Sequence, residues 1–132
     1  MIEIIEHTAD IRLRITASTR EDLFREAIRG TIALLQPQKG ERKVQREVHV
    51  EASDPTALLV DFLNEVLSNA HARREAYDDA AISSLTDYRV EARLLGSEVV
   101  AFGAEVKAVT YHEADIRRDP REQWYTILVY DI

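Results

Sequence analysis

The sequence predicts an α+β fold in which two helices pack on a mostly antiparallel β-sheet, within a single domain spanning residues 1–132. Several short runs alternate apolar and polar residues, which is typical of half-buried strands. Two longer stretches repeat apolar residues at helical spacing and follow capping residues. The resulting order is strand, helix, strand, helix and then a run of strands, which is typical of α+β domains. A chain of 132 residues with 45% hydrophobic content is long enough to bury one core.

The first predicted strand is broken or bent at the segment EHTAD, residues 6–10. Apolar residues from Ile2 to Ile15 keep a two-residue period on both sides of this segment. His7 and Asp10 bracket two small residues inside it. The segment is therefore open to three interpretations, which are a catalytic pair, a half-built metal site and a polar turn between two strand segments.

The first helix is predicted over about residues 19 to 36. Thr19 opens a capping-box pattern, in which its side-chain oxygen accepts from a free backbone N–H while an acidic side chain reaches back. Apolar residues then recur at roughly helical spacing, and Pro37 with Gly40 ends the run.

The second strand is predicted where valines alternate with polar residues between Val44 and Val50. It leads to Asp54 and Pro55, which are typical of a helix N-cap and first helical position. The second helix, about residues 54 to 71, has a continuous apolar stripe.

The last part of the chain is predicted to form strands, because apolar residues alternate again in three runs. We expect turns between them, near Gly96-Ser97 and near Asp119-Pro120. Residues 72–87 show no sustained period and are predicted to be an irregular connection. The three predicted strands span residues 88–94, 105–111 and 124–131.

Composition excludes several classes of function. The chain has no cysteine, so disulfides, thiolate zinc sites and cysteine nucleophiles are excluded. With 17 basic and 24 acidic residues the net charge is −7, and no Lys/Arg cluster stands apart from acidic neighbours. Direct nucleic-acid binding is therefore not expected, and a basic partner or a cation is favoured. No export signal or membrane-spanning run is present, so we expect a cytoplasmic protein without a membrane partner.

A candidate metal site combines Asp10 with the end of the chain. Asp131 follows the last predicted strand, and Ile132 adds a carbonyl or terminal carboxylate. If the last strand ran beside the first, these oxygens would converge, and calcium and magnesium prefer such oxygen ligands. The alternatives are that Asp10 is a general base or caps a turn, and that Asp131 ends a strand in water.

Polar residues of the second predicted helix and of the strand predicted at residues 105–111 are further candidates for a functional site. Asp61 and Glu65 share a helical face, which can hold a cation, meet a basic partner or simply face water, and Asn64 borders the apolar stripe. Lys107 is predicted to share a strand face with Val109 and Tyr111, where a lysine can pair with a carboxylate or phosphate or simply lie at the surface.

Four stretches together resemble the archease family. They occur in the family's order and span the whole chain, and they are EHTAD at 6–10, LLVDFLNEVL at 58–67, VKAVTYH at 106–112 and YDI at 130–132.

This resemblance implies a small cytoplasmic protein cofactor of the GTP-dependent RNA ligase of tRNA splicing and RNA repair. Such cofactors promote guanylylation of the ligase, allow multiple turnovers and can broaden its nucleotide preference. The resemblance also implies that Asp10, Asp131 and Ile132 bind a divalent cation, for which calcium is the first candidate. We expect the RNA ligase to be the binding partner of this protein, and we expect RNA to be bound only indirectly, through the ligase. His7, Lys107, Asp61, Asn64 and Glu65 are then candidates for contacting the partner or orienting the ligands.

No catalytic residue is expected in this chain. It has four glycines, none clustered into a phosphate-binding loop, so it should not ligate RNA itself. Two alternative functions remain open, namely a metal-dependent phosphohydrolase using Asp10, Asp131 and His7, and a structural calcium-binding domain.

Overall fold

A computed structural model of the protein describes residues 1–6 and 10–132. Within these residues the chain forms eight strands and two helices. In chain order they are β1 (Ile2–Glu6), β2 (Ile11–Ala17), α1 (Arg20–Leu34), β3 (Pro37–Glu51), α2 (Pro55–Arg73), β4 (Glu75–Leu85), β5 (Arg89–Phe102), β6 (Ala108–Thr110), β7 (Arg117–Arg118) and β8 (Trp124–Asp131).

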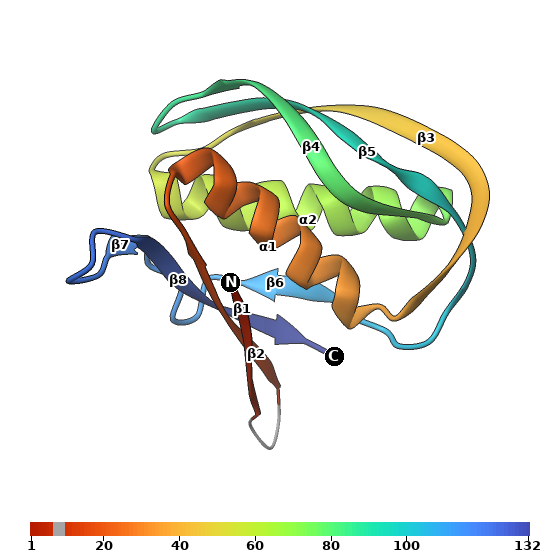
Figure 1. The fold of residues 1–132 in the computed structure, drawn as a ribbon, viewed down its shortest axis with the longest axis horizontal. Coiled ribbons are helices and arrows are strands. Elements are labelled where there is room, and N and C mark those ends of the chain that lie inside the picture. The colour runs from red at the N-terminus through yellow and green to blue at the C-terminus, as the bar shows by residue number, and fades with distance from the viewer. Residues whose placement is uncertain (7–9) are drawn as a thin grey trace.

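The strands form two sheets, with the two helices between them. One sheet has the order β1-β2-β8-β6, with β7 also paired to β8, and the other has the order β3-β5-β4. All described strand pairs are antiparallel. In Figure 1 the three-stranded sheet arches over the helices, and the larger sheet lies on their other side. The predicted α+β class is confirmed, but the prediction of a single sheet is wrong.

The predicted N-terminal caps of both helices are confirmed. The side chain of Thr19 accepts a hydrogen bond from the backbone N–H of Asp22 at 3.1 Å. The carboxylate of Asp54 accepts one from the backbone N–H of Ala57 at 2.8 Å. These contacts satisfy backbone donors that a helix leaves open at its start.

Most of the core lies on the helix surfaces that face the two sheets. The largest buried side chains include Phe24 of α1 and Phe62 of α2, whose ring centroids are 5.5 Å apart. Leu13 and Ile15 of β2 belong to the same buried cluster, which they join from the larger sheet. Neither helix of the described chain combines the length and the apolar character needed to cross a membrane.

The first predicted strand is instead a hairpin. β1 and β2 pair antiparallel from Ile2 opposite Ile15 to Glu6 opposite Ile11. The chain therefore reverses direction around EHTAD rather than bending within one strand. Alternation of apolar residues is the same in both arrangements, so it does not distinguish them.

The prediction of an irregular connection at residues 72–87 is wrong. Most of this segment is β4, an edge strand of the three-stranded sheet. Three successive residues from Glu75 to Tyr77 are buried, and the register with β5 shifts twice. These irregularities hide the two-residue period by which a strand is recognised.

The predicted turn at Gly96-Ser97 is also wrong, because both residues lie inside the continuous strand β5. A Cβ added to Gly96 would lie 2.8 Å from the Cα of Tyr77 and would collide with the carbonyl of Ala76. This glycine therefore permits close approach of β4 and does not mark a turn.

The end of the chain differs less from the prediction. The strand predicted at residues 105–111 is shorter and consists only of β6. The turn near Asp119 is confirmed, because the Asp119 carboxylate accepts from the backbone N–H groups of Arg121 at 2.8 Å and Gln123 at 2.9 Å. β8 has the predicted bounds.

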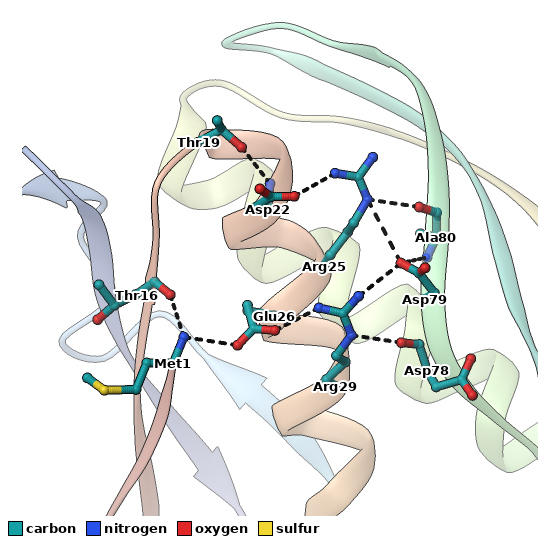
Figure 2. A network of polar contacts seen from close by, with 10 residues as sticks. All are labelled: Met1, Thr16, Thr19, Asp22, Arg25, Glu26, Arg29, Asp78, Asp79 and Ala80. Atoms are coloured by element: carbon teal, nitrogen blue, oxygen red, sulfur yellow. Dashed lines mark hydrogen bonds and ion pairs between the residues drawn. The ribbon is translucent and has the colours of Figure 1, made fainter.

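Two arginines of α1 hold the edge of the three-stranded sheet (Figure 2). The Nε atoms of Arg25 and Arg29 donate to the β4 carbonyls of Ala80 at 3.0 Å and Asp78 at 2.9 Å. Asp79, between them in sequence, accepts from Arg29 at 3.2 Å. These side chains satisfy part of an edge strand that would otherwise present open acceptors.

Candidate functional site

Asp10 and Asp131 lie at the same end of the central strand pair of the larger sheet. β2 and β8 run antiparallel, and the last pair in register at this end is Ile11 with Tyr130. Asp10 immediately precedes β2, and Asp131 is the last residue of β8. The last strand, β8, therefore runs beside β2, the strand that directly follows Asp10.

Ile132 adds oxygen atoms at the same place. It follows Asp131, and it borders a cavity of about 420 Å³ together with Asp10. Asp10 is half-buried, whereas Asp131 and Ile132 are exposed. The side chains of Asp10 and Asp131 and the main chain of Ile132 offer oxygen donors, the kind that calcium and magnesium prefer.

Side chains of the described residues do not supply a third donor beside Asp10 and Asp131. Among residues 1–6 and 10–132, no three side chains of His, Cys, Asp or Glu gather into a possible metal-binding group. A cation held by Asp10 and Asp131 would therefore use main-chain or terminal oxygen as well. His7, the other candidate of this segment, lies outside the described residues.

Lys107 adjoins Asp131 through the main chain. Its backbone N–H donates to the carbonyl of Asp131 at 2.8 Å. Its side chain is exposed and borders a second cavity, of about 660 Å³, with His71 and Phe102.

The predicted shared face of Lys107, Val109 and Tyr111 is wrong. Val109 is buried, while the other two side chains are exposed. The reason is that β6 covers only Ala108–Thr110, so Lys107 and Tyr111 flank the strand and do not continue its alternation.

Asn64 joins α2 to β6 through both atoms of its amide. Its Nδ2 donates to the carbonyl of Val109 at 2.9 Å, and its Oδ1 accepts from the Val109 N–H at 2.8 Å. The side chain thus forms the two hydrogen bonds to the main chain of β6 that a neighbouring strand would form. Since Val109 pairs with Tyr130, Asn64 positions the strand that lies beside Asp131.

Asp61 and Glu65 have different partners. Asp61 accepts a hydrogen bond from the hydroxyl of Tyr111. This bond raises the pKa of Tyr111, because the proton is held between the phenol and an anionic carboxylate. Glu65 accepts from the side-chain amide of Asn69 at 3.3 Å, within its own helix.

A buried contact that sequence reasoning missed holds β8 from the other side. The hydroxyl of Tyr130 lies 2.8 Å from that of Thr31 in α1, and both residues are fully buried. Burial raises the pKa of Tyr130, so the phenol stays neutral. The signal in the sequence was a hydroxyl residue, Thr31, within the apolar stretch of the first helix.

Comparison with known proteins identifies the family. The model of the Archease protein family matches residues 2–132. Archease proteins of Thermococcus gammatolerans and Thermococcus kodakarensis are 34% and 33% identical to this chain, and each match covers 98% of this chain and 97% of the relative. The chain belongs to the archease family.

Solved structures show the same archease fold. An archease of Thermotoga maritima, described as a possible chaperone, has a TM-score of 0.72 at 23% identity and is matched over 100% of this chain and 98% of its own. A protein of Methanobacterium thermoautotrophicum has a TM-score of 0.73 at 20% identity, over 99% and 98% of the two chains. The resemblance inferred from the four motifs is thus confirmed for the family and the fold.

Proposed function

We propose that this archease is a protein cofactor of the GTP-dependent RNA ligase. It promotes guanylylation of the ligase, allows multiple turnovers and broadens the nucleotides that the ligase accepts. Membership of the archease family supports this proposal. The description of the Thermotoga maritima relative as a possible chaperone agrees with action on another protein.

The register of β2 and β8 is the observation that carries the proposal. Asp10 directly precedes and Asp131 directly follows the terminal pair of this register, Ile11 with Tyr130, although 120 residues separate the two aspartates in sequence. We propose that Asp10, Asp131 and Ile132 hold a divalent cation, with calcium as the first candidate. A bound cation would offset their negative charge and offer a positive centre to phosphate oxygens.

The remaining residues act by positioning and by contact with the ligase. Asn64 fixes β6 against α2, which keeps the adjoining β8 and its Asp131 in place. Lys107 presents an exposed ammonium group next to the acidic end of β8, and we propose that it contacts the ligase or its nucleotide. His7, Asp61 and Glu65 are weaker candidates for such contacts. Activation by ordering the reactants of a partner lowers a barrier without covalent chemistry in this chain.

The test is a guanylylation assay. Transfer of labelled GMP from GTP to a cognate RNA ligase is followed without this protein, with it, and with its Asp131→Ala variant. We expect faster labelling with the natural protein and loss of the acceleration with the variant. Glu51→Ala is the matched control, because Glu51 is also an exposed acidic residue that ends a strand.

Two results would contradict the proposal. An active ligase that labels equally fast with and without this protein excludes activation. Hydrolysis of phosphate esters by the isolated protein, lost in Asp10→Ala, would instead indicate a metal-dependent phosphohydrolase.

A further inference from the structure

The main chain of Asp131 is held from the β6 side of the larger sheet. The register of β8 with β2 ends at Tyr130. The register of β8 with β6 continues one residue further, to Asp131, which lies opposite Ala108. The backbone N–H of Lys107 also donates to the carbonyl of Asp131 at 2.8 Å. The position of this candidate ligand therefore depends on Lys107 and Ala108.

Helix α2 holds the segment around β6 at two points. Asn64 forms its two hydrogen bonds with the main chain of Val109. The Nε2 atom of His71 donates to the carbonyl of Val106 at 3.0 Å, and both valines are buried. His71 follows Asn64 by about two helical turns, so the two side chains lie on the same side of α2. The two residues that hold the end of β8 lie between these anchors in the chain.

The ring of His71 is oriented by its neighbours as well as by this hydrogen bond. A carbonyl oxygen only accepts, so Nε2 carries a proton in the neutral ring as well as in the charged one. The ring also packs against Phe102, with 5.8 Å between the two centroids. The guanidinium of Arg74 lies 5.9 Å from the centroid of the Phe102 ring. The donor of His71 is therefore already directed at its acceptor in the folded protein.

We propose that His71 is a positioning residue for the candidate cation site, and that it acts through its hydrogen bond to Val106. The inference rests on the proposed cation site and adds to it a residue that does not touch the cation. Without this bond the Val106 end of the segment loosens, and the carbonyl of Asp131 loses a fixed partner in Lys107. A ligand in a mobile segment binds a cation more weakly, because binding must then also order the chain.

Amide hydrogen exchange measures the positioning directly. The N–H of Lys107 is protected by its hydrogen bond to Asp131, and NMR follows its exchange in the calcium-free protein. We expect exchange about fivefold faster in His71→Ala, the effect of losing one ordinary hydrogen bond. His71→Gln should stay within about twofold of the natural rate, because its amide can donate at a similar reach. His49→Ala is the matched control, because His49 is also exposed but lies in β3, in the other sheet.

Calorimetric titration with calcium measures the consequence for the cation site. We expect the dissociation constant for calcium to rise about fivefold in His71→Ala and to stay within about twofold of the natural value in His71→Gln. His71→Phe should behave like His71→Ala, because it keeps a ring against Phe102 but cannot donate. This variant decides the matter if thermal unfolding in chelator shows that His71→Ala is destabilised by the loss of its ring.

The outcomes separate this inference from the proposed function. Unchanged exchange of the Lys107 amide in His71→Ala and His71→Phe would contradict the positioning role. Faster exchange with an unchanged calcium affinity would show that His71 only stabilises the fold, and the inference would be wrong. If the natural protein binds neither calcium nor magnesium, the proposed cation site fails and this inference fails with it. If calcium affinity responds as expected while the ligase is not activated, the inference is supported and the proposed activation of the ligase is wrong.

Discussion

Asn64 differs from the other polar residues of α2 because both of its amide atoms bond one main-chain residue. The N–H and carbonyl of Val109 are paired by this side chain and belong to a strand of only three residues. A strand this short gains little from its own ladder. We infer that Asn64 is a main tie between α2 and β6.

Asn64→Ala should lower the free energy of unfolding by about 2 kcal/mol, because it leaves two main-chain groups of Val109 unpaired. Urea unfolding measures the change. Asn69→Ala is the control, since Asn69 lies on the same helix and its side chain forms hydrogen bonds with Glu65 and Arg73 of that helix. Equal effects of the two substitutions would show that the tie to β6 adds no stability.

Glu75 is a buried acidic residue with two strong partners. Arg46 donates to its two oxygens at 2.8 and 2.6 Å, and Tyr77 donates at 2.7 Å. Only 1% of the Glu75 side chain is exposed, against 32% for Arg46. The hydrogen bonds from Arg46 hold the pKa of Glu75 below its usual value despite burial.

Stability should therefore fall in acid partly through Glu75. A carboxyl whose pKa is lower in the folded state contributes fully above its ordinary pKa, near 4.3, and loses that contribution as the pH falls through the folded value. Glu75→Ala should cost about 3 kcal/mol at neutral pH, because it leaves Arg46 without its buried partner.

The measurement is urea unfolding at several pH values below 5 and at pH 7. The difference between the natural protein and Glu75→Ala should shrink as the pH falls. A difference that stays constant down to pH 2 would mean that the loss comes from packing and not from the ion pair. Glu47→Ala is the control, because its partner Arg93 and Glu47 itself are both largely exposed.

At the scale of elements, the close packing of β4 on β5 depends on the absence of a side chain at Gly96. The main chain of β4 at Ala76 and Tyr77 occupies the space that a Cβ would need. The neighbouring atoms are backbone, so they cannot turn aside as a flexible side chain can.

Gly96→Ala should cost about 3 kcal/mol of unfolding free energy, as expected when an added group forces backbone shifts. Gly40→Ala is the matched control in β3, where the added Cβ would meet only the flexible side chain of Glu98. Comparison of the urea unfolding midpoints of the two variants separates the steric effect at Gly96 from the effect that replacing any glycine by alanine has on stability. A similar small effect of both would show that β4 can move away from β5.

At the scale of the whole molecule, the larger sheet joins the two ends of the described chain. β1 and β2 come from the N-terminal part of the chain and β8 from the C-terminal part, and in the sheet β2 lies between β1 and β8 (Figure 1). Asp10 and Asp131 thereby lie at the same end of the sheet, next to the terminal pair of the β2–β8 register. The divalent cation that we propose for this place would offset their like charges and stabilise the folded state.

Calcium at 100 times its dissociation constant should add about 2.7 kcal/mol to the free energy of unfolding, which raises the melting temperature by several degrees. The gain should vanish with a chelator and in Asp131→Asn. In chelator this variant should be at least as stable as the natural protein, because one repelling charge is gone. Thermal unfolding of both proteins, with calcium and with chelator, tests the predicted stabilisation by calcium and the predicted stability of the variant in chelator. No response of the natural protein to calcium or magnesium would exclude the cation site.

Features that depend on neighbouring residues could be predicted from the amino-acid sequence. The caps at Thr19 and Asp54, the two helical stretches and the strand β8 follow from local hydrogen-bonding chemistry and from periodicity. The motifs at residues 6–10 and 130–132 also marked Asp10 and Asp131 as candidates and indicated the family, which the comparisons confirmed.

The pairing of the strands and the space that they enclose could not be predicted from local sequence patterns. The two-residue period of β1 and β2 fits one bent strand as well as a hairpin, and the bulges of β4 erase that period. The pairing of β2 with β8, the division into two sheets and the cavity at Ile4 each depend on burial of apolar surface between distant segments. A local sequence pattern indicates which face of a strand is apolar, but it does not indicate against which other segment that face is buried.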